Sequence, residues 1–115
     1  MSLKQVIIIR KDLNMRKGKM CAMAAHSSLK AVQQAPAIPT QVWEMTGHKK
    51  IVVGVNALIE LMTVYNAAKA RMLPCSIILD EGLTEFHNIP TYTAVAIGPC
   101  DEDEVNKITG QLPLL

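Results

Sequence analysis

The sequence predicts an α/β fold in which four strands form one sheet and helices pack on both of its faces. Short β-branched runs alternate along the chain with longer segments of helical periodicity, and this alternation is typical of the α/β class. The 115 residues are enough to build one hydrophobic core. We therefore expect a single domain over residues 1–115.

Four short apolar runs predict the strands, at residues 5–9, 51–55, 75–79 and 93–97. Gly98 and Pro99 are expected to end the last strand. The segment between the third and fourth strands, residues 80–92, is long for a domain of this size. Long loops often carry function, so we treat this segment as a functional candidate.

Helical periodicity predicts helices at residues 19–34 and 56–72, and a short helix after Asp101. Residues 43–50 are expected to be helical or irregular. The first helix should end before Pro36, with a loop at residues 37–40. Asn56 is the expected N-cap of its helix. The acidic residues 101–104 suit the positive end of the last helix and need no functional explanation.

The phase of the first helix predicts which side chains share a face. One apolar stripe is expected to form the buried side, and it consists of Ala22, Ala25, Leu29 and Val32. A neighbouring stripe consists of Lys19, Met23, His26 and Lys30. Lys19 and His26 should therefore project from the same face, beside the buried side.

Charge is distributed unevenly along the chain. Residues 1–50 contain nine Lys and Arg against two acidic residues, and residues 51–115 contain three against eight. Such asymmetry favours a basic face for a polyanion. The alternative is that the two halves fold together and their charges intermix on an ordinary solvated surface.

Several classes of protein are disfavoured. Nucleotide-binding glycine loops, the serine-hydrolase elbow and the zinc-protease motif do not occur in the sequence. No apolar run is long enough to span a membrane, and no secretory signal is evident. The three cysteines are widely spaced and lack metal-binding spacing, so we expect buried, reduced thiols, no metal site and a cytoplasmic location.

Asp80 and Lys19 are the candidate chemical pair. Asp80 follows a predicted strand, where α/β sheets favour ligand sites, and Lys19 lies at the start of a helix. If the first and third strands are parallel neighbours, these residues share one edge of the sheet. The pair would then activate water and stabilise an oxyanion. Alternatively, Asp80 only caps a turn and pairs with Lys19.

A motif that runs from Arg10 to His26, R-x-D-L-x-M-x-x-G-K-x-x-A-x-x-x-H, closely resembles the signature of the archaeal and eukaryotic type of peptidyl-tRNA hydrolases. Further segments of the chain resemble the same family in the same order. They are Trp43 with residues 49–53, Asp80-x-Gly82-x-Thr84, residues 93–99 and residues 107–112.

This resemblance implies a four-stranded mixed sheet, frequent dimerisation, and hydrolysis of the ester that joins a peptide to tRNA. It implies no cofactor and no metal. By the same resemblance, Lys19, Asp80 and Thr93 are the catalytic residues. Supporting site residues are expected to be His26, Thr84 and Met23. The tRNA-binding surface is expected to contain Arg10, Lys11, Arg16, Lys17 and Lys30.

The chain departs from the family pattern around this site. Met23, Gly54 and Glu85 stand where the family usually has Gln, Lys and Gln, and Glu81 and Leu83 are also unusual. These changes remove polar or positive groups and add negative charge. The alternative they leave open is a related protein that binds tRNA or another polyanion without cleaving it.

Overall fold

Four strands form one mixed sheet in the order β2-β1-β4-β3 in the computed structural model, which describes residues 2–83 and 85–115. β1 (Leu3–Arg10) pairs in parallel with β2 (Lys50–Val55) and antiparallel with β4 (Thr91–Asp101). β3 (Cys75–Asp80) pairs antiparallel with β4 and forms one edge of the sheet. The mixed four-stranded sheet with helices on both faces confirms the predicted fold class.

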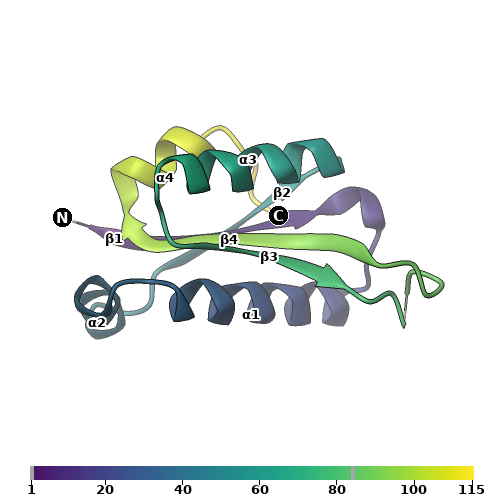
Figure 1. Ribbon diagram of the computed structural model, residues 1–115, viewed down its shortest axis with the longest axis horizontal. Helices are drawn as coiled ribbons and strands as arrows, with labels where there is room; N and C mark the ends of the chain where they lie inside the picture. The colour runs from purple at the N-terminus through teal and green to yellow at the C-terminus, as the bar shows by residue number, and fades with distance from the viewer. Residues whose placement is uncertain (1, 84) are drawn as a thin grey trace.

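Two layers of helices enclose the sheet (Figure 1). One face is covered by α1 (Lys17–Gln33) and α2 (Ala37–Met45). The other face is covered by α3 (Leu58–Ala70) and α4 (Glu102–Thr109). The core accordingly has two halves, because alternate side chains of each strand point to opposite faces. Ile7 and Ile9 of β1 face the first layer, whereas Val6 and Ile8 face the second.

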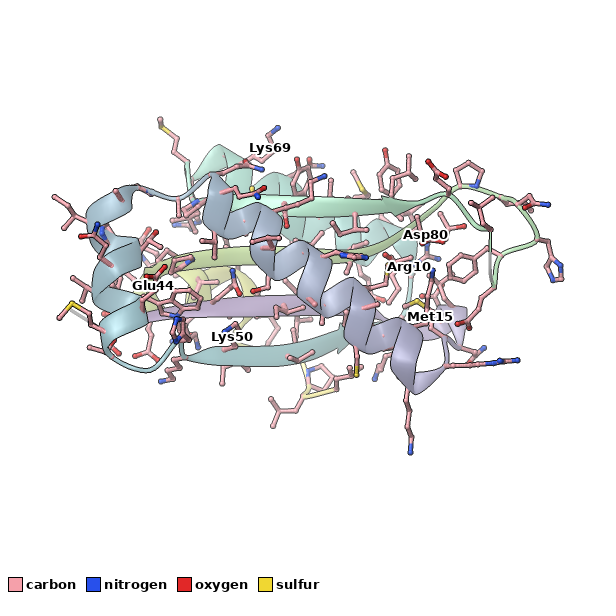
Figure 2. All side chains as sticks on the ribbon, turned by 90° about the horizontal axis from the view of Figure 1, so that it is seen from below. Arg10, Met15, Glu44, Lys50, Lys69 and Asp80 are labelled. Atoms are coloured by element: carbon pink, nitrogen blue, oxygen red, sulfur yellow. The ribbon has the colours of Figure 1, made fainter. Side chains whose placement is uncertain are left out.

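The condition that the first and third strands are parallel neighbours is not met. β1 and β3 do run in the same direction, but β4 lies between them and pairs with both. The carboxyl ends of β1 and β3 still reach the same edge of the sheet, where Arg10 and Asp80 lie (Figure 2). The short 3-10 helix η1 (Lys11–Leu13) then leads from β1 towards α1.

Several predicted boundaries differ from the structure. Residues 37–40 are the first turn of α2, not a loop, and Pro39 fits there because the first N–H groups of a helix need no intrahelical acceptor. β4 does not end at Gly98 but continues through a cis Gly98–Pro99 bond to Asp101. Asn56 is not the N-cap of α3; Ala57 is, and the backbone N–H of Asn56 donates to Glu60.

The predicted buried stripe of α1 is also wrong. The buried residues of α1 are Met23, Ser27 and Ala31, whereas Leu29 is 60% exposed. α1 packs against a part of the sheet where Ala94 and Ala96 present small side chains, so small residues can form a close contact there. The polar group of Ser27 is satisfied because its hydroxyl donates to the carbonyl of Ala24.

The cysteines match expectation only in part. All three are free thiols, and Cys75 and Cys100 are buried, but Cys21 is exposed on α1. Burial raises the pKa of the Cys100 thiol to about 11. No helix in the described part of the chain is long and apolar enough to cross a membrane.

Candidate active site

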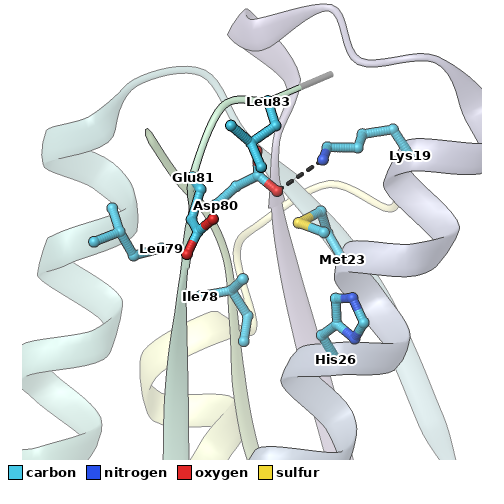
Figure 3. A pocket seen from close by; sticks show the side chains of 8 residues that line it. All are labelled: Lys19, Met23, His26, Ile78, Leu79, Asp80, Glu81 and Leu83. Atoms are coloured by element: carbon cyan, nitrogen blue, oxygen red, sulfur yellow. Dashed lines mark hydrogen bonds and ion pairs between the residues drawn. The ribbon is translucent and has the colours of Figure 1, made fainter. Parts of the chain in front are cut away.

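Asp80 and Lys19 meet at the end of the sheet where β3 stops, beside the first turn of α1. The Lys19 ammonium donates to Asp80 Oδ1 over 2.7 Å, and the side chains of Lys19 and Asp80 are only 14% and 15% exposed. The backbone N–H of Gly82 donates to the other carboxylate oxygen over 2.9 Å. Figure 3 shows the pair at the mouth of a pocket between α1 and β3.

These contacts stabilise the ionised form of Asp80. The hydrogen bond from Lys19 is the largest cause that lowers the pKa of Asp80 below its ordinary value. Partial burial opposes this shift, while the Gly82 N–H and the positive charges of Lys19 and His26 add to it. The site therefore holds a carboxylate that stays ionised at neutral pH, next to a cation.

The pocket beside this pair has a volume of about 380 Å³. Its lining combines charged groups with an apolar wall and consists of Lys19, Met23, His26, Ile78, Leu79, Asp80, Glu81 and Leu83. Met23 and His26 lie below Lys19 along the same side of α1 (Figure 3). This agrees with the predicted phase of Lys19, Met23 and His26. Met23 is 3% exposed, so its side chain forms the floor of the pocket rather than a polar contact.

Thr93 lies on β4 close to the end of β3, at an irregularity in their pairing. Ile78 pairs with Ala94 and Leu79 pairs with Tyr92, so Thr93 has no partner residue on β3. Such bulges often redirect a side chain next to a functional site. Thr93 is fully buried, and its hydroxyl has no hydrogen-bond partner within the described part of the chain. A buried hydroxyl without a partner costs about 1–3 kcal/mol. Thr93 is not among the residues that line the pocket beside Asp80.

The loop after β3 contributes Phe86, which sequence reasoning missed, beside Glu85 and Gly82, which the sequence analysis already names. Nζ of Lys19 lies 5.8 Å from the centre of the Phe86 ring, a cation–π contact. Glu85 Oε1 accepts a hydrogen bond from the backbone N–H of Arg16 at the start of α1. The turn-forming Asp-x-Gly spacing was the available signal for Gly82. Thr84, predicted to line the site, lies outside the described residues.

Four of the five predicted tRNA-binding residues gather at the same end of the molecule. The guanidinium of Arg10 pairs with Asp12 and also donates to the Tyr92 carbonyl, so it braces the start of β4. The other three, Lys11, Arg16 and Lys17, are exposed around the start of α1. Lys30 is exposed in the last turn of α1, so it lies at the far end of that helix.

Gly54, which removes a usual lysine, lies under one of these cations. A Cβ atom at Gly54 would come within 2.7 Å of the Lys11 side chain, whose methylene groups cover the glycine. The missing side chain at Gly54 therefore leaves room for Lys11 of η1, whose side chain lies over the glycine. In the described residues, no group of three or more His, Cys, Asp or Glu side chains is placed to hold a metal ion.

Comparisons with known proteins identify relatives over nearly the whole chain. A family model described as peptidyl-tRNA hydrolase PTH2 matches residues 3–115. A peptidyl-tRNA hydrolase from Methanocaldococcus jannaschii is 47% identical, with 98% of this chain and 100% of the relative covered. Those from Methanothermobacter thermautotrophicus and Haloquadratum walsbyi are 42% and 37% identical, with at least 97% of each chain covered.

A solved structure also shares the fold. A protein of unknown function from Agrobacterium tumefaciens superimposes with a TM-score of 0.58 at 14% identity, over 100% of this chain and 98% of the other. At this identity the similarity supports the fold alone.

Proposed function

Since the chain belongs to the peptidyl-tRNA hydrolase family, we propose that it hydrolyses the ester bond between peptide and tRNA and releases free tRNA. The observation that carries this proposal is the Lys19–Asp80 ion pair, partly buried at the mouth of a pocket. The pair supplies an ionised carboxylate and a cation at one point, and ester hydrolysis needs both a proton acceptor and an oxyanion stabiliser.

The Asp80 carboxylate acts as the general base. It accepts a proton from a water molecule whose oxygen attacks the ester carbonyl carbon. Negative charge then develops on the carbonyl oxygen, close to the Lys19 ammonium, which stabilises it. Collapse of the tetrahedral intermediate breaks the bond to the ribose oxygen, and the proton held by Asp80 passes to that leaving oxygen. The lowered pKa of Asp80 keeps the carboxylate ionised at neutral pH.

The remaining site residues have positioning roles in this proposal. The buried hydroxyl of Thr93, which lacks a partner among the described residues, is suited to orient the attacking water. His26 lines the pocket beside Asp80, and Met23 provides an apolar floor. Thr84 is proposed to line the site on the basis of its match to the family motif.

The exposed cations around the start of α1 form the proposed tRNA surface. Contacts of Lys and Arg with phosphate carry little sequence information, so this surface would bind tRNAs of any sequence and would lose affinity as salt increases. Arg10 contributes by bracing β4, and Lys30 would extend the surface along α1. We also propose that the protein functions in the cytoplasm and as a homodimer.

Release of the blocked amino acid from N-acetyl-aminoacyl-tRNA tests this function. We expect cleavage by the wild-type protein and a loss of about 10²-fold or more in Asp80→Asn, because the amide cannot accept the proton. Asp103→Asn is the matched control, since Asp103 is exposed on α4. A folded wild-type protein that retains tRNA on a filter without cleaving it would contradict the proposal and favour a binding protein.

A further inference from the structure

β3 is an open edge of the sheet, and it leads directly into the proposed active site. Among the described residues, β3 pairs with β4 alone, so its other side has no strand partner there. Figure 1 shows β3 at the front of the sheet, between the layers that contain α1 and α3. Asp80 is the last residue of this strand.

The pattern of pairing shows which backbone groups face the open side. Gly98 N–H donates to the Pro74 carbonyl, directly across from it in the register of β3 and β4. In an antiparallel ladder, hydrogen-bonded and non-hydrogen-bonded residue pairs alternate. The backbone N–H and C=O groups of Ser76 and Ile78 therefore point to β4. Those of Ile77 and Leu79 point away from it. Among the described residues outside β4, none is hydrogen-bonded to the main chain of Ile77 or Leu79.

This edge lacks the features that usually protect an exposed strand. Exposed edges are commonly blocked by Lys, by Pro within the strand or by a bulge in the edge strand itself. β3 reads CSIILD and contains neither Lys nor Pro, and the extra residue at its irregular point is Thr93 of β4. Leu79 is 51% exposed beside the pocket. The edge is therefore open to another extended chain.

We propose that the peptide portion of the substrate binds as an additional strand along β3, through main-chain hydrogen bonds to Ile77 and Leu79. This inference rests on the proposed function, which places the ester at Asp80 and Lys19. Main-chain bonding would allow peptides of any sequence to bind, because every residue except proline offers the same donor and acceptor.

The charges around the site determine which part of the substrate lies along β3 and which part lies at the start of α1. The exposed cations Arg16 and Lys17 lie at the start of α1, beyond Lys19, and suit the phosphates of tRNA. From Asp80, β3 extends in the other direction along the molecule, and Figure 2 shows Asp80 and Arg10 at the same end. A peptide with its ester carbonyl at Asp80 then runs parallel to β3, with its earlier residues beside Leu79 and Ile77.

The parallel direction fixes the pattern of bonds. A residue opposite Ile78 donates its N–H to the Ile77 carbonyl and accepts from the Leu79 N–H. If the esterified substrate residue lies opposite Asp80, the substrate residue opposite Ile78 is the third from the ester. The second substrate residue, opposite Leu79, points its N–H away from β3. Three substrate residues span about 10 Å, so the contacts are complete for a tripeptide.

The experiment measures kcat/KM for tRNA esterified with N-acetyl-alanine, with N-acetyl-trialanine, and with trialanines N-methylated at the second or the third residue from the ester. We expect the tripeptide to be cleaved about tenfold faster than the single residue. Methylation of the third residue should lower kcat/KM of the tripeptide about three- to tenfold, because it blocks one hydrogen bond. Methylation of the second residue should have little effect. Equal rates for all four substrates, or equal losses from both methyl groups, would overturn the proposal.

A pair of variants tests the strand itself. Leu79→Pro removes the outward N–H at an edge position that tolerates proline, whereas Leu79→Ala removes only the side chain. We expect Leu79→Pro to lose the preference for the tripeptide and Leu79→Ala to keep it, with folding checked by thermal unfolding; the opposite result contradicts the proposal. If Leu79→Pro does not fold, the N-methyl series in the wild-type protein decides. Failure to cleave any of the substrates contradicts the proposed function, whereas cleavage without these preferences contradicts only the binding along β3.

Discussion

The neighbours of Asp80 favour the ionised form of the carboxyl group that the proposed mechanism uses. The Lys19 hydrogen bond is the main cause that lowers its pKa, against a partial burial that raises it. Because the folded pKa lies below the unfolded value near 3.8, the ion pair contributes stability above pH 3.8 and loses it as pH falls through the folded pKa.

Replacement of Lys19 should therefore raise the pKa of Asp80. In Lys19→Met, burial persists but the main opposing hydrogen bond is absent. A carboxyl ¹³C NMR titration measures this shift independently of catalysis. Lys107→Met is the control, since it should affect Glu104, its partner on α4, and leave Asp80 unchanged. An Asp80 titration that is identical in the wild type and Lys19→Met would show that the ion pair does not control this carboxylate.

Met23 illustrates how a change in a family motif acts on packing as well as on chemistry. Its side chain is buried among Ile7, Ile9 and Ile78 beneath the pocket. Met23→Gln restores the usual family residue but places an amide in this apolar cluster. We expect it to lower the free energy of unfolding by about 1–3 kcal/mol. Met23→Leu should cost less than about 1.5 kcal/mol.

Denaturant unfolding of both Met23 variants measures these costs, and the ester cleavage assay measures their activity. We expect Met23→Gln to cleave faster per folded molecule, because a polar group returns to the site. A lower activity in Met23→Gln than in Met23→Leu would show that the pocket is adapted to an apolar floor.

The loop that follows β3 holds the Asp80 carboxylate in place. Gly82 has a positive φ of 81°, and a Cβ atom there would clash with the backbone oxygen of Ile89. The same glycine donates its N–H to Asp80. Gly82→Ala should therefore distort this turn, and we expect at least about tenfold lower cleavage activity.

Gly18→Ala is the matched control for this loop prediction. Gly18 is in the first turn of α1, and a Cβ atom there would contact nothing within 4 Å. Alanine favours helix over glycine by about 1 kcal/mol or less, so this variant should keep its activity and unfold at the same or a higher temperature. Cleavage rates and melting temperatures of the two variants test the expectation. Equal activities would mean that the turn at Gly82 does not position Asp80.

The helices also show what the sequence could and could not predict. Local patterns predicted β1, β3 and the phase that aligns Lys19 with His26, because these depend on short-range periodicity. The buried side of α1 was missed because Ser27, a polar residue, faces the sheet, and its carbonyl accepts from Ser76 of β3. That contact joins residues 49 positions apart, and no local pattern contains it.

For the molecule as a whole, the meeting of Asp80 and Lys19 was predicted on the condition that β1 and β3 are neighbours, which the structure does not meet. Asp80 is the last residue of β3 and Lys19 lies in the first turn of α1, and these ends of the two elements come together even though β4 separates β1 from β3. The bulge that isolates Thr93 depends on the register of β3 and β4, which the sequence does not reveal. Resemblance to the family, rather than periodicity, was what pointed to Thr93.

The two ends of the molecule carry charge in physically different ways. α4 begins with three acidic residues, which the positive end of a helix stabilises. α1 begins with cations instead, and its first turn contains no acidic residue. Lys17 is exposed there, in a position that costs stability rather than adding it. In the proposed function, the phosphates of bound tRNA would offset this cost.

Lys17→Gln should consequently change stability and RNA binding in opposite directions. We expect unfolding to become less favourable by about 0.3–1 kcal/mol, as the repulsion at the helix end is removed. The slope of log affinity for tRNA against log salt should fall by about 1, since one phosphate contact is lost. Filter binding over a range of salt and thermal unfolding measure the two effects. Lys69→Gln, near the end of α3 on the opposite face, should leave the slope unchanged. Loss of both stability and salt slope in Lys17→Gln would instead mean that Lys17 supports the fold, because a pure phosphate contact cannot stabilise the free protein.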